Sequence, residues 1–189
     1  MLKKLSYLFL LVFVPVLMLA QRESDSSRNE QEKPNFKDRI YFDGNFNIGV
    51  GTSTFINLSP RVGYKITDNF SAGLGAKYWY FSWNDGFYRY SGSLYGGGVF
   101  ARRNLTPNLF LTGEYELLNL AGLTSKPKEP FWNEFLFAGG GYQQNVGIVN
   151  LYAVVLYDIL QNPYSSYIYP TIPIAGVPII FRLGINVGI

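Results

Sequence analysis

Apolar and polar residues alternate along most of this chain. From residue 39 to residue 189 no segment keeps the 3.6-residue period of an amphipathic helix, whereas short runs keep a period of two. In the first run, Phe42 and Phe46 point to one face of a strand while Asp43 and Asn45 point to the other. Eight such runs can be distinguished, and six of them alternate cleanly, so the pattern predicts eight β-strands. The runs cover residues 40–50, 56–65, 70–80, 90–103, 109–117, 132–143, 150–159 and 181–189.

The connections between the runs alternate in length. Residues 66–69, 104–108 and 144–147 are tight and polar, whereas residues 82–89, 119–130 and 161–173 are longer. The connection at 51–53 is an exception because it is short although it falls among the long ones. Tight turns that alternate with longer loops are typical of a transmembrane up-and-down barrel, with the turns on the periplasmic side. An even number of strands brings both ends of the barrel to that side.

Short repeated sequences in this region have structural interpretations. Two of the tight turns share a Thr-x-Asn sequence, at residues 67–69 and 106–108, which predicts one turn geometry used twice; a chance match is the alternative. The glycine triplets at residues 96–98 and 139–141 fall inside predicted strands. Glycine eases bending or close approach there, so these triplets are not phosphate-binding loops.

The last run alternates up to Ile189 without a polar tail. An open strand edge presents unpaired backbone groups, and closing the sheet into a barrel covers that edge. We therefore expect an all-β fold, an eight-stranded antiparallel up-and-down transmembrane β-barrel formed by residues 39–189.

Charged residues occupy mid-strand positions on the polar face, while the opposite face is almost uniformly Leu, Ile, Val, Ala, Phe and Tyr. A soluble barrel such as a lipocalin has its apolar residues inside, the reverse of a membrane barrel. We expect the apolar face to meet lipid and the charges to pair inside, because unpaired charge in a dry interior is costly. Tyrosines at positions 78, 80, 90, 115 and 157 lie near strand ends, as an interfacial aromatic girdle requires. The expected ion network consists of Asp43, Arg61, Lys77, Arg102, Glu114, Glu116, Asp158 and Arg182.

The N-terminal segment has the layout of a secretory signal. Residues 1–20 combine Lys3 and Lys4 with a short apolar stretch and end at Ala20, which predicts a cleaved signal peptide; a single membrane anchor is the alternative. Residues 21–38 hold nine charges of mixed sign and one aromatic, which predicts a flexible periplasmic linker. Removing residues 1–20 lowers Lys+Arg from 16 to 14 against 13 Asp+Glu, so the remaining chain carries about +1 and has no basic patch for nucleic acid.

Four segments of the chain resemble the small outer-membrane β-barrel proteins, the eight-stranded domains of OmpA type and OmpX type. They are Val-Gly-Tyr-Lys-Ile-Thr-Asp-Asn-Phe-Ser-Ala-Gly-Leu-Gly at 62–75, Phe-Ala-Arg-Arg at 100–103, Glu-Tyr-Glu at 114–116, and residues 182–189. The resemblance covers residues 39–189 and implies location in the cell outer membrane, with insertion by the barrel-assembly machinery. It also implies no peptidoglycan-binding domain after the last strand. The chain departs from the family pattern at Ile189, where such barrels usually end on an aromatic residue.

Residue types that most catalytic and metal sites need are missing. The chain has no His and no Cys, which excludes the usual nucleophile–base triads and His or Cys metal sites. A paired-carboxylate glycosidase using Glu114 and Glu116 is the catalytic alternative, but an eight-stranded barrel has an interior that side chains fill. We expect no enzymatic activity and no cofactor or metal. A narrow ion path is the functional alternative to structural pairing of the interior charges.

Aromatic residues in the long loops are the candidate contact residues. Aromatic and proline-rich loops suit adhesion, lipopolysaccharide contact or a protein partner, and an interfacial belt that touches only lipid headgroups is the alternative. We expect a structural or surface-interaction barrel whose partners are outer-membrane lipid, the assembly machinery and an extracellular ligand or surface protein. A narrow channel or transporter component and a soluble exported ligand-binding barrel are the alternatives. The loop residues are Trp83, Phe87, Tyr88, Tyr164, Tyr167 and Tyr169.

Overall fold

The computed structural model describes residues 36–50, 53–84, 86, 89–123, 130–169, 171–174 and 177–188. The expected signal peptide and residues 21–35 of the expected linker lie outside the described residues. The last residues of the linker interval begin a short 3-10 helix, η1 (Phe36–Arg39). The Phe36 ring lies 5.3 Å from the ring of Tyr64, so this helix packs on the barrel.

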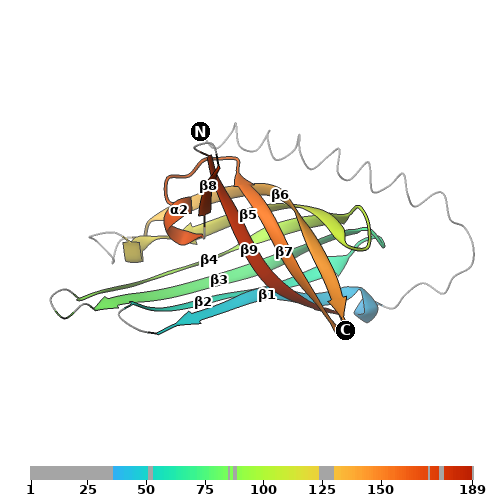
Figure 1. Cartoon of the computed structure of the whole chain (residues 1–189), viewed down its shortest axis with the longest axis horizontal. Coiled ribbons are helices and arrows are strands. Elements are labelled where there is room, and N and C mark those ends of the chain that lie inside the picture. The colour runs from blue at the N-terminus through green and yellow to red at the C-terminus, as the bar shows by residue number, and fades with distance from the viewer. Residues whose placement is uncertain are drawn as a thin grey trace, which may run out of the picture. The chain divides into compact units, whose positions relative to one another are not determined.

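Eight antiparallel strands close into an up-and-down barrel, which confirms the fold predicted from the alternation, and one short strand is added to it (Figure 1). The ring closes where β1 pairs with β9, with Tyr41 opposite Gly188 and Gly44 opposite Ile185. The last strand is therefore paired on both sides, by β7 and by β1. The barrel strands are β1 (Ile40–Gly49), β2 (Ser53–Lys65), β3 (Phe70–Asn84), β4 (Arg89–Asn104), β5 (Leu109–Asn119), β6 (Trp132–Val146), β7 (Val149–Asp158) and β9 (Val177–Gly188); the extra strand is β8 (Thr171–Ile174).

One end of the barrel, the turn end, holds the β2–β3, β4–β5 and β6–β7 connections, the start of β1 and the end of β9. In the β2–β3 turn the Phe70 N–H donates to the Thr67 hydroxyl at 3.0 Å. In the β4–β5 turn the Leu109 N–H donates to the Thr106 hydroxyl at 2.9 Å. The repeated Thr-x-Asn sequence thus has a physical basis, because a threonine side chain closes each turn in the same way.

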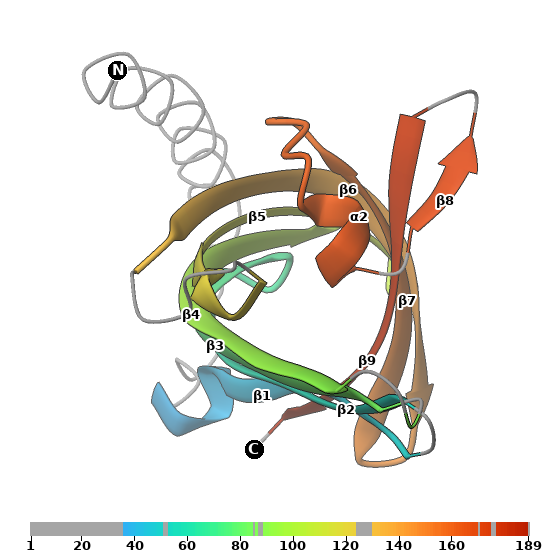
Figure 2. The same ribbon diagram turned by 90° about the vertical axis from the view of Figure 1, so that its left-hand side faces the viewer.

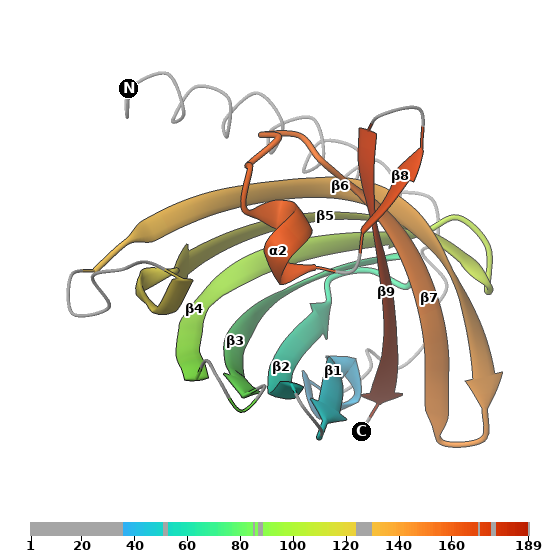
Figure 3. The same ribbon diagram turned by 60° about the vertical axis from the view of Figure 1, so that its left-hand side comes forward.

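The opposite end, the loop end, is more elaborate than the sequence pattern indicates. The connection expected at 161–173 contains a one-turn helix, α2 (Ser165–Ile168), and most of β8, which pairs with the first half of β9. The β5–β6 connection contains a 3-10 helix, η2 (Ala121–Leu123). Figures 2 and 3 show α2 against the inner side of the barrel wall, where Ile168 and Tyr169 join the hydrophobic core. No helix in the described part of the chain is long and apolar enough to cross a membrane.

The two faces of the barrel wall differ in polarity. Outward positions carry exposed Leu, Ile, Val, Phe and Tyr side chains, and inward positions carry the buried charges. The runs at 90–103 and 132–143, whose alternation is unclear in the sequence, also have distinct inner and outer faces. Leu94 and Phe100 of β4 and Phe135 and Phe137 of β6 are buried inside. Leu94, Phe135 and Phe137 belong to one hydrophobic cluster with residues of β5, β7, β9 and α2. Most of this cluster lies toward the loop end, and Phe110 and Tyr152 extend it toward the turn end.

Candidate functional site: a string of charges inside the barrel

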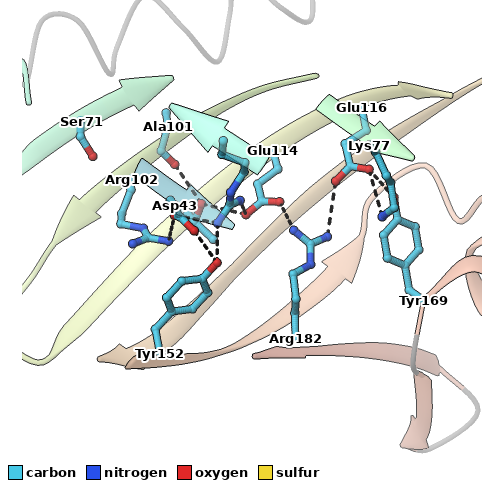
Figure 4. Close-up of polar contacts among 12 residues, drawn as sticks. Asp43, Ser71, Lys77, Ala101, Arg102, Glu114, Glu116, Tyr152, Tyr169 and Arg182 are labelled. Atoms are coloured by element: carbon cyan, nitrogen blue, oxygen red, sulfur yellow. Dashed lines mark hydrogen bonds and ion pairs between the residues drawn. The ribbon is translucent and has the colours of Figure 1, made fainter. Parts of the chain in front are cut away.

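Seven buried or nearly buried charged side chains form one continuous chain of ion pairs through the interior, with cations and carboxylates in strict alternation. We call this set the charge string. Its members lie at inward positions of β1, β2, β3, β4, β5 and β9, so side chains that are far apart in the sequence meet in the lumen (Figure 4). In order of contact they are Arg102, Asp43, Arg61, Glu114, Arg182, Glu116 and Lys77.

The half of the charge string nearer the turn end is built around Asp43. Its Oδ2 atom lies 2.9 Å from Arg61 Nη2 and 3.2 Å from Arg102 Nη2. Arg61 then reaches across to β5, with its Nη1 atom 2.9 Å from Glu114 Oε1. Arginine suits this position because its planar fork can hold two carboxylates at once.

The other half of the charge string is built around Arg182. Its Nη1 atom lies 2.6 Å from Glu114 Oε2, and its Nη2 atom lies 3.4 Å from Glu116 Oε1. Figure 4 shows the Arg182 guanidinium between these two carboxylates. The string ends at Lys77, whose Nζ atom lies 3.6 Å from Glu116 Oε2. Glu114 and Glu116 are two residues apart on β5, so the period of the strand places both carboxylates on the same inner face.

Two tyrosines complete the hydrogen bonding of the string, and sequence reasoning assigned neither of them to it. The Tyr152 hydroxyl donates to Asp43 Oδ1 at 2.6 Å and accepts from Arg61 Nη2 at 2.8 Å. The Tyr169 hydroxyl donates to a carboxylate oxygen of Glu116, and Lys77 Nζ lies 3.8 Å from the centre of the Tyr169 ring. Burial, with the negative charge of Glu116 adding to it, raises the pKa of Tyr169 well above its usual range, so this phenol keeps its proton.

A glycine makes room for one of these tyrosines. A Cβ atom at Gly184 of β9 would lie 2.2 Å from the Tyr152 hydroxyl oxygen, closer than any side chain tolerates. The inward position of Tyr152 within its run was the sequence signal for its place in the lumen. The need for Gly184 opposite it follows only from the β7–β9 register, which pairs these two residues.

The remaining residue of the expected ion network, Asp158, lies apart from the charge string. It is buried at the end of β7, where the chain turns toward α2. Its carboxylate accepts hydrogen bonds from the N–H groups of Leu160 and Asn162, at 3.0 and 2.8 Å, and from the Ser165 hydroxyl. Within the described part of the chain, these loop donors rather than a cation satisfy this carboxylate.

The expected loop-contact residues divide into exposed and enclosed side chains. Trp83 and Tyr167 are exposed, with 49% and 71% of their surface accessible. Tyr164 is partly buried and packs edge-on against the ring of Phe131 at 5.6 Å. Tyr169 departs from the surface position expected for it, because α2 turns it inward onto Glu116 and Lys77. Phe87 and Tyr88 lie outside the described residues.

Free space inside the barrel is unevenly distributed. Beside the charge string there is a cavity of about 30 Å³, lined by Arg61, Lys77, Glu114 and Arg182 among others. A larger hollow of about 330 Å³ opens at the turn end and reaches Arg102. No group of three or more acidic side chains in the described ranges is placed to hold a metal ion. The ion pairs of the charge string therefore connect opposite sides of the barrel wall, and the space directly beside Arg61, Glu114 and Arg182 is small.

Comparisons with known proteins find no relative: no protein-family model matches the chain, and neither a curated protein nor a solved structure matches it. The fold class, a closed eight-stranded antiparallel β-barrel, is therefore assigned from the strand pairing of this chain alone. The resemblance to small outer-membrane barrels remains a prediction.

Proposed function

We propose that this protein is a small outer-membrane β-barrel with a filled interior, and that it acts as a structural or surface-interaction protein through its loop end. The observation that carries the proposal is the polarity of the barrel. The outward side chains of Phe46, Leu74 and Leu183 are 61%, 67% and 61% exposed, whereas Asp43 and Arg102 are 5% and 4% exposed. This arrangement is the reverse of a water-soluble barrel and suits a wall that faces lipid.

The strand lengths support a membrane-spanning wall. A transmembrane β-strand needs about 9–11 residues. The shortest barrel strands, β1 and β7, have 10 residues each, and the other strands have 11 to 16. Every barrel strand is therefore long enough to cross the apolar layer of a bilayer.

A row of outward aromatic residues supports the same proposal. Tyr78 of β3 lies opposite Tyr95 of β4, and the Tyr95 ring meets the Trp132 ring of β6 edge-on at 6.0 Å. All three rings are exposed. Aromatic side chains with a polar atom concentrate where the acyl chains of a bilayer meet the headgroups, so this row suits one interfacial girdle.

The packed interior favours a structural role over a channel. A cavity of about 30 Å³ beside the charge string is of the size of one water molecule. The cross-barrel ion pairs and the hydrophobic cluster also place side chains across the described lumen. A channel function would require the ion pairs of the charge string to separate. An enzyme would have to work without histidine or cysteine. We infer no catalytic role.

The loop end supplies the contact surface in this proposal. Trp83 at the end of β3 and Tyr167 of α2 are exposed there, and β8 projects with the exposed side chain of Ile172. Exposed aromatic side chains are the residues that most often anchor protein interfaces. The proposed partners are outer-membrane lipid, the machinery that inserts the barrel, and an extracellular ligand or surface protein bound at this end.

Membrane fractionation followed by electrophoresis of unboiled and boiled samples tests the proposal. We expect the protein in the outer-membrane fraction, with the unboiled band migrating faster because the closed barrel stays folded in detergent. Gly139→Val is the matched unfolded control, since a Cβ atom at Gly139 would lie 1.9 Å from the Val155 carbonyl oxygen and block the β6–β7 pairing. Release with the periplasmic fraction would contradict the membrane proposal.

Conductance in a planar bilayer separates the filled barrel from the channel alternative. The folded protein should show no steady conductance, because the charge string closes the lumen. A steady conductance that depends on folded protein and is absent for Gly139→Val would replace the structural role by a channel.

A further inference from the structure

The two strands that close the barrel are paired over only part of their length. β1 and β9 share four residue pairs, and Gly44 opposite Ile185 is the last of them toward the loop end. The other ladders of the barrel have 9 to 15 pairs each. Beyond Gly44 the two strands diverge, as two views show (Figures 1 and 3).

The divergence leaves two strand edges unpaired. Residues 45–49 of β1 pair with β2 on one side and with no other strand in the described part of the chain. On the β1 side of β9, the short strand β8 pairs with residues 177–180, so residues 181–184 are paired only with β7. Every second residue of an antiparallel strand turns its N–H and C=O toward one neighbour, so both edges carry unpaired backbone groups. Such edges are templates for pairing with another chain.

A glycine and a proline lie where β1 leaves β9. Gly44, the last residue of β1 that pairs with β9, lies opposite Pro60 of β2. A Cβ atom at Gly44 would lie 2.6 Å from the Ser59 carbonyl oxygen, so the backbones of β1 and β2 approach closely here. Pro60 has no N–H, and the β2–β3 pairing is interrupted at Ser59 and Pro60. The divergence therefore coincides with an irregularity of the wall itself.

The two unpaired edges are complementary to each other. They run antiparallel, and continuing the register of the four closed pairs sets Phe46 opposite Leu183. The same register sets Ile48 opposite Phe181. All four side chains are exposed and apolar, and apolar cross-strand pairs stabilise antiparallel sheets. Each copy of the chain thus carries two matching edges, which its own divergence keeps apart.

We infer that these edges pair between two copies of this chain. Residues 45–48 of one copy pair with residues 181–184 of the other, and the reciprocal pairing forms at the same time. A two-fold axis parallel to the barrel axes relates the copies, so the dimer is closed. Each copy keeps its four closed pairs, and the backbone groups of both edges find partners. A lipid acyl chain in the same place would supply no donor or acceptor.

The dimer goes beyond the proposed function and does not depend on it. An open strand edge pairs with another chain in water as well as in a membrane. A membrane would strengthen the preference, because an open sheet edge in hydrocarbon leaves its backbone groups without water.

Disulfide trapping tests the inference, and the chain suits it because it has no cysteine. Phe46→Cys and Leu183→Cys are made as separate single variants of the full chain, folded together in detergent micelles and oxidised. Side chains directly opposite each other in an antiparallel pair are close enough to be cross-linked. We expect a covalent dimer on a non-reducing gel for the mixture and for neither variant alone.

A mixture of Phe42→Cys and Val187→Cys is the matched control. Both residues belong to the same two strands, but they lie opposite each other within one copy. This mixture should give no covalent dimer, whereas both changes in one chain should give an internal disulfide. Equal amounts of dimer in the two mixtures would indicate random collision and overturn the inference.

Placing Phe46→Cys and Leu183→Cys in one chain separates the other occupants of the edges. A covalent dimer supports the inference. An internal disulfide alone would show that the barrel closes on itself, and no disulfide would leave the edges to lipid or water; either result overturns the inference.

Two further measurements keep the test decisive. The faster migration of unboiled samples before oxidation checks that each variant is folded. Sedimentation equilibrium of the unaltered chain in the same micelles should give the mass of two chains. The mass of one chain would overturn the inference even if a cysteine variant fails to fold.

Discussion

Replacing Leu74 by arginine tests the direction in which the apolar face points. Leu74 is 67% exposed on β3 and lies between Val62 of β2 and Val99 of β4, so its surroundings on the outer face are apolar. It is four residues from Phe70, the first residue of β3 at the turn end. At about 3.4 Å per residue and a tilt of about 40°, Leu74 lies roughly 10 Å from the turn end, near the middle of an apolar band about 25 Å tall.

The expected cost follows from this depth. An arginine on the lipid face near the bilayer midplane destabilises a barrel by about 2–4 kcal/mol, and the cost falls to about 0–1 kcal/mol near the interface. Ile148→Arg is therefore the matched control, because Ile148 is 86% exposed in the β6–β7 turn. In a water-soluble barrel both arginines would point into solvent, and neither would be costly.

The assay is reversible urea unfolding of the barrel in phospholipid vesicles, followed by the gel shift between folded and unfolded forms. Leu74→Arg should lower the free energy of unfolding by about 2–4 kcal/mol, and Ile148→Arg by at most about 1 kcal/mol. Equal stability of Leu74→Arg and the unaltered chain would refute the lipid-facing assignment of β3. An equal loss in both variants would refute the depth argument.

Two further predictions concern the interior. Glu114→Gln removes the carboxylate between Arg61 and Arg182 and should cost about 3–5 kcal/mol in the same unfolding assay. Exposed Glu134→Gln should cost less than about 1 kcal/mol, and similar losses in the two variants would argue against the charge string as a tie. Gly184→Ala should cost about 1–3 kcal/mol by overpacking. Its control is Gly113→Ala, whose Cβ would meet only the Phe137 carbonyl oxygen, at 3.9 Å, and equal costs would contradict the Tyr152 clash.

Most of the wall could be predicted from the sequence, because successive side chains of a strand must point to opposite faces. The alternation around Asp43, Arg61 and Arg182 sufficed to place these charges on one face, and the need to cover the last strand indicated closure. The prediction was weakest for β4 and β6. Glycines interrupt both of these strands. In β6 three successive residues, Phe135, Leu136 and Phe137, are apolar, so the sequence does not show which of them face inward.

The loop end could not be predicted in the same way. The sequence between residues 161 and 173 is rich in Tyr and Pro, and exposed loops and enclosed plugs share that composition. The position of Tyr169 beneath α2 depends on Ile168 and Tyr169 finding apolar partners across the lumen. Those partners lie on β4, β5, β6, β7 and β9, so no local pattern marks the contact.

The sequence by itself determined the eight barrel strands, the inner and outer faces of the six that alternate cleanly, and the residues that supply the interior charge, since each depends on a period of two along a single segment. Only the tertiary structure decided which charge meets which, that Tyr152 and Tyr169 join them, and that Arg102 ends the string beside an open hollow. Register and closure set these contacts, because they bring together side chains from strands up to 109 residues apart, as between Asp43 and Tyr152. A single strand carries no information about the strand that will lie across the lumen from it.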